Sequence, residues 1–187
     1  MRAPIDRRLR AWLDSGGSLS RRIAAAFGGF AVRRVRQLTG PATAEEWRAL
    51  GVRGARRVHV REVVLWGDGQ PLVLARSVLP AAQAGLAWRA VRGLGSRPLA
   101  DLLFGGRALQ RRALGHLRCQ PSRAPARRPR FRAALGAAVW PSGVTWGRRA
   151  RFTHRGVPLV LTEWFSADLS RHPPGKVKPT GDPRSTA

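Results

Sequence analysis

The residue best suited to chemistry is Glu163, an acidic side chain in an otherwise apolar stretch. In the segment VPLVLTEWF, β-strand alternation places it on one face with Val157, Leu159, Leu161 and Phe165. A carboxylate among such neighbours is costly to bury unless it is paired or protonated, and burial raises the pKa of a carboxyl group. The pattern therefore predicts either a carboxyl group that can donate a proton or a structural glutamate paired with one of the many arginines.

Arg61 is the second candidate, because it lies on a predicted strand between apolar residues. It shares one strand face with His59, Val63 and Leu65. A buried guanidinium needs an anionic partner and can hold a carboxylate through two parallel hydrogen bonds. An exposed face or a salt bridge within the protein would explain the same pattern. Arg76, on the next predicted strand, is a candidate of the same kind that would support the site from a second layer.

Other kinds of site find little support in the sequence. The histidines lack the spacing of metal ligands, and no Gly-rich loop joins a strand to a helix as in nucleotide-binding folds. The single Cys119 excludes an internal disulfide and makes a thiolate metal site unexpected. We expect no metal site. The histidines are His59, His116, His154 and His172.

The charge of the chain points in another direction. Among 187 residues, 35 are Lys or Arg and 10 are Asp or Glu, which gives a net charge of +25. Such a balance is typical of proteins that bind nucleic acid or anionic membranes. However, the basic residues are almost all arginines, spread from Arg2 to Arg184 without clustering. This spread favours the codon bias of a GC-rich genome, and binding to a specific nucleic acid stays as an alternative.

Two β-hairpins form the expected frame. Residues 58–66 and 72–79 are rich in β-branched residues and flank a Gly-rich turn, while residues 146–154 and 157–165 flank Arg155-Gly156. We expect a further strand at 30–37 and helices at 5–13, 19–27, 43–50, 80–91 and 98–104. Residues 107–118 fit a helix or a strand, and the Pro- and Arg-rich residues 121–132 are expected to be irregular.

Hairpins with helices between them predict an α+β fold, a single domain built on an antiparallel sheet with surrounding helices. We expect this domain over residues 1–167 and a disordered tail, rich in Pro, Gly, Ser and Lys, over residues 168–187. The sequence shows no apolar run of about 20 residues and no secretory signal, so a cytoplasmic protein is expected. A monomer is expected because no exposed apolar stripe stands out.

Several segments together resemble the chorismate pyruvate-lyases of bacterial ubiquinone biosynthesis. They are Trp12-Leu13 through Ser18-Leu19-Ser20-Arg21-Arg22, VREVVLWGDGQPLVLARSVLP, LGSRPLADLLF and WGRRARFTHRGVPLVLTEWF. They follow the family's order and cover most of residues 12–165. Two departures stand out: residues 121–132 look longer than usual, and the tail after residue 166 has no counterpart.

The resemblance implies an enzyme that eliminates pyruvate from chorismate to give 4-hydroxybenzoate, with no metal or coenzyme. It implies a cavity under helical flaps, in which Arg61 grips the ring carboxylate and Glu163 meets the ring oxygen. It also implies that Leu19, where the family commonly has Met, and Leu99 approach the carboxylate end, in part through backbone amides. A non-catalytic ligand-binding domain of the same fold and a basic nucleic-acid-binding protein remain the alternatives.

Overall fold

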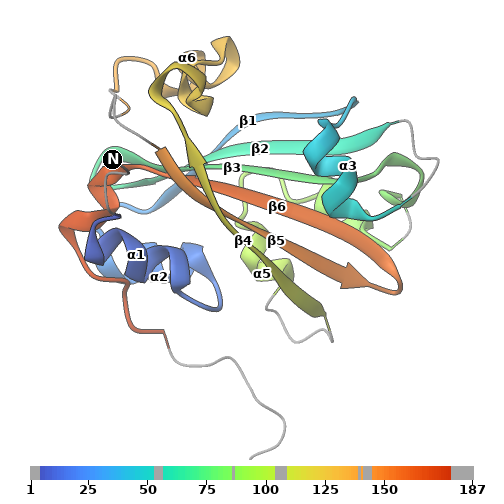
Figure 1. Cartoon of the computed structure of the whole chain (residues 1–187), viewed down its shortest axis with the longest axis horizontal. Helices are drawn as coiled ribbons and strands as arrows, with labels where there is room; N and C mark the ends of the chain where they lie inside the picture. Colours follow the sequence, from blue (N-terminus) through green and yellow to red (C-terminus); the bar gives the residue numbers. More distant parts are fainter. Residues whose placement is uncertain are drawn as a thin grey trace, which may run out of the picture.

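A six-stranded antiparallel sheet is the frame of this computed structural model, which describes residues 5–52, 57–85, 87–103, 109–138, 140 and 145–177. The strands lie in the order β1-β2-β3-β6-β5-β4 (Figure 1). Each strand runs antiparallel to its neighbours, which confirms the predicted α+β class. The bounds are β1 Ala31–Gly40, β2 Val58–Gly67, β3 Gln70–Pro80, β4 Gln110–Cys119, β5 Thr145–His154 and β6 Val157–Phe165.

Both predicted hairpins are confirmed. β2 and β3 are joined by Asp68 and Gly69, and β5 and β6 by Arg155 and Gly156. All four of these residues have positive φ angles, between 49° and 75°. Two successive left-handed residues are what a tight two-residue turn needs to match the twist of its strands. The hairpins therefore fix which side chains of β2, β3, β5 and β6 face each side of the sheet.

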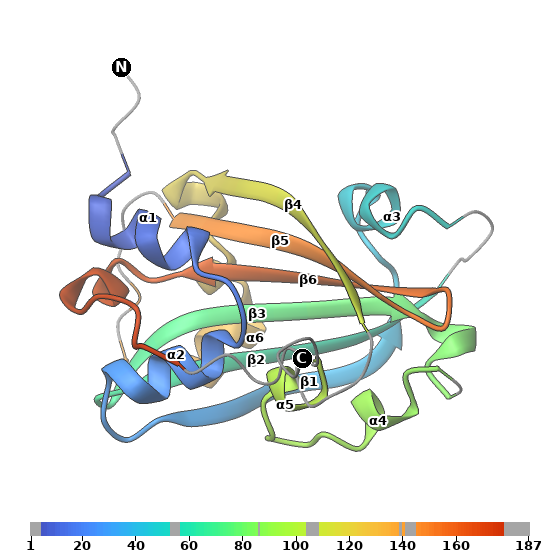
Figure 2. The same ribbon diagram turned by 90° about the horizontal axis from the view of Figure 1, so that it is seen from below.

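The helices cover the two faces of the sheet unequally (Figures 1 and 2). One face carries α1 (Arg7–Asp14), α2 (Leu19–Ala26), α4 (Arg89–Arg92) and α5 (Leu99–Leu103), while α3 (Ala44–Leu50) and α6 (Pro129–Leu135) lie on the other. Two of these helices are capped at their N-termini: the Ser18 side chain accepts a hydrogen bond from the Arg21 amide, and Thr43 and Glu46 form a capping box.

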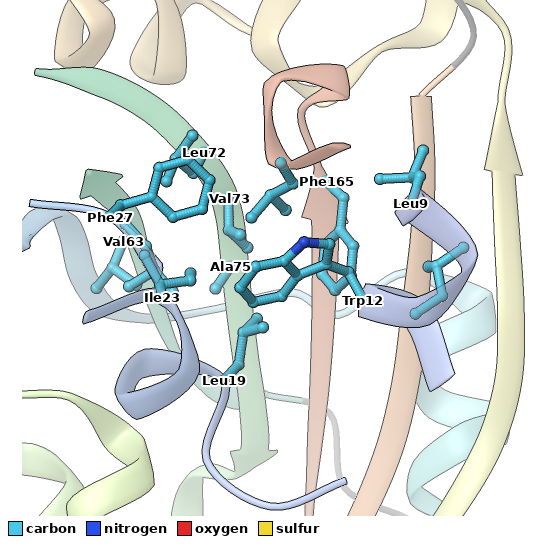
Figure 3. Close-up of a cluster of buried hydrophobic side chains, with 13 residues drawn as sticks. Leu9, Trp12, Leu19, Ile23, Phe27, Val63, Leu72, Val73, Ala75 and Phe165 are labelled. Atoms are coloured by element: carbon cyan, nitrogen blue, oxygen red, sulfur yellow. The ribbon is translucent and has the colours of Figure 1, made fainter. Parts of the chain in front are cut away.

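A core between the sheet and the first two helices anchors these helices (Figure 3). Trp12 and Ile23 have no exposed surface. They pack with Leu19 and Phe27 against sheet residues that include Val63, Ala75 and Phe165. This packing holds the connection between α1 and α2 over the sheet face that carries Arg61 and Glu163.

Two segments differ from the prediction, and a third takes one of the two forms that the sequence left open. The single helix expected at 80–91 is wrong: a 3-10 turn at Ala81–Gln83 and the short α4 replace it. Gly85 weakens the helix, and Trp88 is buried with its Nε1 donating to the Val157 carbonyl oxygen at 3.1 Å, so packing sets the chain path. Residues 110–119 form strand β4. Residues 121–132, expected to be irregular, hold two 3-10 turns and the start of α6.

The disordered tail expected from residue 168 is wrong for residues 168–177. A 3-10 helix at Ala167–Arg171 buries Leu169 completely. The Trp12 Nε1 group donates to the His172 carbonyl oxygen at 2.9 Å, and Arg22 Nη1 donates to the Gly175 carbonyl oxygen at 3.0 Å. These contacts hold the segment against α1 and α2. The tail residues 178–187 lie outside the described residues.

None of the helices in the described part of the chain has the length and apolar character needed to cross a bilayer.

Candidate active site

A cavity lies between the sheet and the helices α2 and α5, and it brings together the four residues predicted for the site. Arg61, Glu163, Leu19 and Leu99 all line it. Most of the remaining wall is apolar, which keeps water from competing for the charged groups. The other lining residues are Gly17, Ser20, Val32, Val63, Leu65, Ala75, Ser77, Pro98, Ala100, Leu103, Arg111, Arg148, Ala150, Phe152 and Leu161.

Arg61 is a buried cation without an anionic partner among the described residues. It is 3% exposed, and its Nη2 donates to the carbonyl oxygens of Gly95 and Arg97 at 3.0 and 2.7 Å. Its Nε is buried and has no hydrogen-bond partner in the described structure. Desolvation, followed by the positive charge of Arg34, lowers the pKa of Arg61 to about 10. A carboxylate bound in the cavity would supply the missing charge and the missing acceptor.

Glu163 is also buried, but it has a partner. It is 8% exposed, and its Oε2 accepts a hydrogen bond from Nε of Arg148 at 2.7 Å. The two residues are direct neighbours across β5 and β6. The pairing with one of the many arginines is therefore present, and Glu163 also lines the cavity. The prediction of a lone carboxyl group among apolar neighbours missed this pair.

Arg148 connects Glu163 to the helical cover. It is 7% exposed, and its Nη1 donates to the carbonyl oxygens of Trp12, Leu13 and Ser15, where α1 ends and the connection to α2 begins. Sequence reasoning did not single out Arg148. Strand alternation could have found it, because Arg148 and Ala150 share the cavity face of a predicted hairpin strand.

Arg111 is a second lining residue that was not predicted. It lies on the edge strand β4, in the segment that fitted a helix and a strand equally well, so its direction could not be read from the sequence. Its guanidinium has no hydrogen bond or ion pair in the described structure. Desolvation and then the nearby charge of Arg148 lower the pKa of Arg111, and Glu163 opposes them.

Arg76 does not support the cavity, contrary to the prediction. Its neighbours Ala75 and Ser77 line the cavity, so strand alternation turns Arg76 to the opposite face. There its Nε bonds Glu46 at 2.6 Å and its Nη1 bonds Glu62 at 3.0 Å. Arg76 thus belongs to a separate ionic cluster beneath α3 and α6.

The described residues contain no group of three or more His, Cys, Asp or Glu side chains placed to hold a metal ion.

Comparison with known proteins gives a consistent result over most of the chain. Residues 4–170 match the family model described as chorismate lyase. A protein of Azoarcus sp. (strain BH72) named "Probable chorismate pyruvate-lyase" is 42% identical over 161 residues, which is 86% of this chain and 84% of that protein. A protein of the same name from Methylococcus capsulatus is 39% identical and aligns with 84% of this chain and 93% of its own length.

Solved structures show the same fold at low sequence identity. The C-terminal domain of PhnF is similar with a TM-score of 0.52 and 14% identity, over 83% of this chain and 92% of that one. The "ligand-binding domain of a putative GntR-family transcriptional regulator" from Bordetella bronchiseptica has a TM-score of 0.50 and 20% identity, over 88% and 93% of the two chains. At such identities, the likeness concerns the fold alone.

Proposed function

This chain belongs to the chorismate lyase family, and from that premise we propose that it converts chorismate into 4-hydroxybenzoate and pyruvate. The observation that carries the proposal is the buried, unpaired Arg61 in the same apolar cavity as Glu163. A cavity of this kind is suited to a small aromatic acid, with its carboxylate at the guanidinium and its polar ring substituent at the other end.

The proposed reaction balances without any external reagent. The bond between the ring and the enolpyruvyl ether oxygen breaks, and the ring carbon that carries the hydroxyl group loses its hydrogen. The ring becomes aromatic, the side-chain methylene gains one hydrogen, and the ether oxygen becomes the ketone of pyruvate. The hydrogen can reach the methylene directly or through a base. Because aromatisation drives the reaction, the protein needs only to orient the dianion and to stabilise charge on the separating parts.

Arg61 would hold the ring carboxylate through Nε and its remaining N–H groups. Glu163 would meet the ring hydroxyl group. Arg148 already bonds this carboxylate, which would accept a hydrogen bond from the hydroxyl group; a proton donor was one of the two alternatives that the sequence left open. Leu19 and Leu99 would enclose the ring beneath the helical cover, and their amides are the ones that the resemblance puts near the carboxylate end.

We further propose that the protein works in the cytoplasm as a monomer, and that its 4-hydroxybenzoate feeds ubiquinone biosynthesis. Of the alternatives, a non-catalytic ligand-binding protein is favoured by the regulatory domains that share the fold. The joint presence of Arg61 and Glu163 favours the enzyme. A nucleic-acid-binding protein is favoured by charge alone, and a salt titration against unrelated DNA duplexes would test it.

The decisive experiment mixes the purified protein with chorismate and follows the absorbance of 4-hydroxybenzoate, with pyruvate measured by lactate dehydrogenase. We expect equal amounts of the two products. Arg61→Gln and Glu163→Gln should each remove most of the activity while the far-ultraviolet circular dichroism stays unchanged. Near-normal turnover in either variant would exclude that residue from the mechanism. A folded wild-type protein that binds 4-hydroxybenzoate without cleaving chorismate would support the non-catalytic alternative.

A further inference from the structure

The cavity holds more positive charge than its own acid can balance. Three arginines line it, Arg61, Arg111 and Arg148, and its one described carboxylate is Glu163. The described lining therefore has an excess of two positive charges. Chorismate carries two carboxylates, one on the ring and one on the enolpyruvyl side chain, whereas 4-hydroxybenzoate carries only one.

The three arginines differ in their existing contacts. Arg148 is already engaged by Glu163 and by the carbonyl oxygens at the end of α1. Arg61 is fixed by two carbonyl oxygens of the loop before α5, and its Nε has no partner among the described residues. The Arg111 guanidinium has neither a hydrogen bond nor an ion pair within the described part of the chain, so it is available to a ligand.

Arg111 and Glu163 line the same cavity, and their charges interact. On β4, Arg111 pairs in register with Phe152 of β5, which also lines the cavity. Its charge environment is set by Arg148 and Glu163, whereas that of Arg61 is set by Arg34. It is an exposed residue of the edge strand, so it reaches the cavity from the rim.

We propose that Arg111 binds the carboxylate of the enolpyruvyl side chain and thereby selects the dianionic substrate over the monoanionic product. The inference rests on the proposed lyase function. In chorismate the side chain is attached to the ring carbon next to the one that carries the hydroxyl group. If Arg61 holds the ring carboxylate and Glu163 meets the hydroxyl group, the side chain must lie on the Glu163 side of the ring. Arg111 is the lining arginine whose guanidinium has no described partner and whose charge interacts with Glu163. After cleavage, pyruvate would remain at Arg111 and 4-hydroxybenzoate at Arg61.

The test compares two stable ligands that do not react. 3-(Carboxymethoxy)-4-hydroxybenzoate imitates the substrate dianion, and its carbamoylmethoxy analogue has the same shape without the second charge. Isothermal titration with the wild-type protein should show a preference for the dianion of about tenfold to a hundredfold, the range for a hydrogen bond between charged groups. In Arg111→Gln this preference should fall to about twofold or less, with affinity for 4-hydroxybenzoate retained within about threefold.

Arg112→Gln is the matched control, because it removes the same charge from the adjacent, exposed position on β4, which does not line the cavity. It should retain the preference for the dianion. A wild-type protein without this preference, an Arg111→Gln variant that keeps it, or an equal loss of affinity for all three ligands would overturn the proposal. Because these ligands are not turned over, the result is separate from the chorismate assay. Suppose that the wild-type protein does not cleave chorismate, but that Arg111→Gln removes its preference for the dianion. The Arg111 site would then be supported, and the proposed lyase function would be refuted.

Discussion

Replacing Arg148 by Met should strongly destabilise the protein. Arg148 and Glu163 are 7% and 8% exposed, so neither charge is well solvated. Removing one partner of a buried ion pair leaves the other charge uncompensated, at a loss of about 3–5 kcal/mol. The substitution also removes the donor to the carbonyl oxygen of Ser15. For a chain of this length such a loss should lower Tm by about 6–20 °C, and a domain of ordinary stability would remain folded.

Urea denaturation at pH 7.5, followed by tryptophan fluorescence, measures the free energy of unfolding. The double variant Arg148→Met/Glu163→Gln should be more stable than Arg148→Met, because Gln removes the unpaired charge. The two losses should therefore be far from additive, with a coupling energy above about 1 kcal/mol.

The neighbouring Arg149 provides the control. Its guanidinium bonds Glu45 at 3.2 Å, and the Glu45 side chain is 63% exposed. The Arg149 side chain is itself only 12% exposed, and its Nε donates to Thr162 Oγ1 at 3.0 Å. Because Glu45 stays solvated when the pair is broken, Arg149→Met should lose about 1–2 kcal/mol, less than Arg148→Met. The reasoning fails if Arg148→Met loses no more stability than Arg149→Met, or if the double variant shows additive losses.

Three further predictions follow from the same contacts. Arg61→Met should weaken 4-hydroxybenzoate binding by about tenfold or more in calorimetry. The urea midpoint should stay unchanged or rise, because the substitution removes a buried cation that has no described anionic partner. A lower midpoint would contradict this. Gly147→Ala should lose about 1–3 kcal/mol in urea denaturation, because a Cβ there would clash with the neighbouring strand backbone and the Trp164 ring; an unchanged midpoint would contradict it. Burial alone would raise the pKa values of Glu46 and Glu62, but bonds from arginines, Arg76 among them, lower both. The two carboxylates should therefore contribute their full stabilisation above the pKa of about 4.3 that a glutamate has in the unfolded chain. This stabilisation should be lost as the pH falls through their lower pKa values in the folded protein. Urea midpoints measured from pH 7 to pH 3 check this, and a decline of the midpoint confined to the range above pH 5 would contradict it.

The elements that could be predicted are those whose local pattern agrees with their packing. Alternation on β2 and β6 correctly placed Arg61 and Glu163 on apolar strand faces, because the hairpin turns leave only one register for each strand. The helix expected at 80–91 failed because the burial of Trp88 depends on Val157, which is distant in sequence. Long-range contacts of this kind leave no local signal.

The site was predicted less completely than the strands, for the same reason. The partner of Glu163 could have been any of the many arginines, and only the alignment of β5 with β6 selects Arg148. Arg111 was missed because its segment fitted two periodicities. The ordered part of the tail was missed because a composition rich in Pro and Gly does not show that backbone carbonyls there accept hydrogen bonds from Trp12 and Arg22.

Glu62 and Arg61, which are adjacent on β2, show how the pairing of a buried charge can indicate a binding site in so basic a protein. Glu62 has no exposed surface and is bonded by three arginines, Arg36, Arg76 and Arg130. Arg61, one residue earlier and on the other face, is almost as deeply buried with no described acid beside it. Acids are scarce in this chain, and solvent can stabilise the exposed arginines without them. Solvent cannot stabilise a buried arginine in this way, so its charge stays uncompensated until an anion binds. The uncompensated charge of Arg61 is therefore a stronger indication of ligand binding than the net charge of the chain.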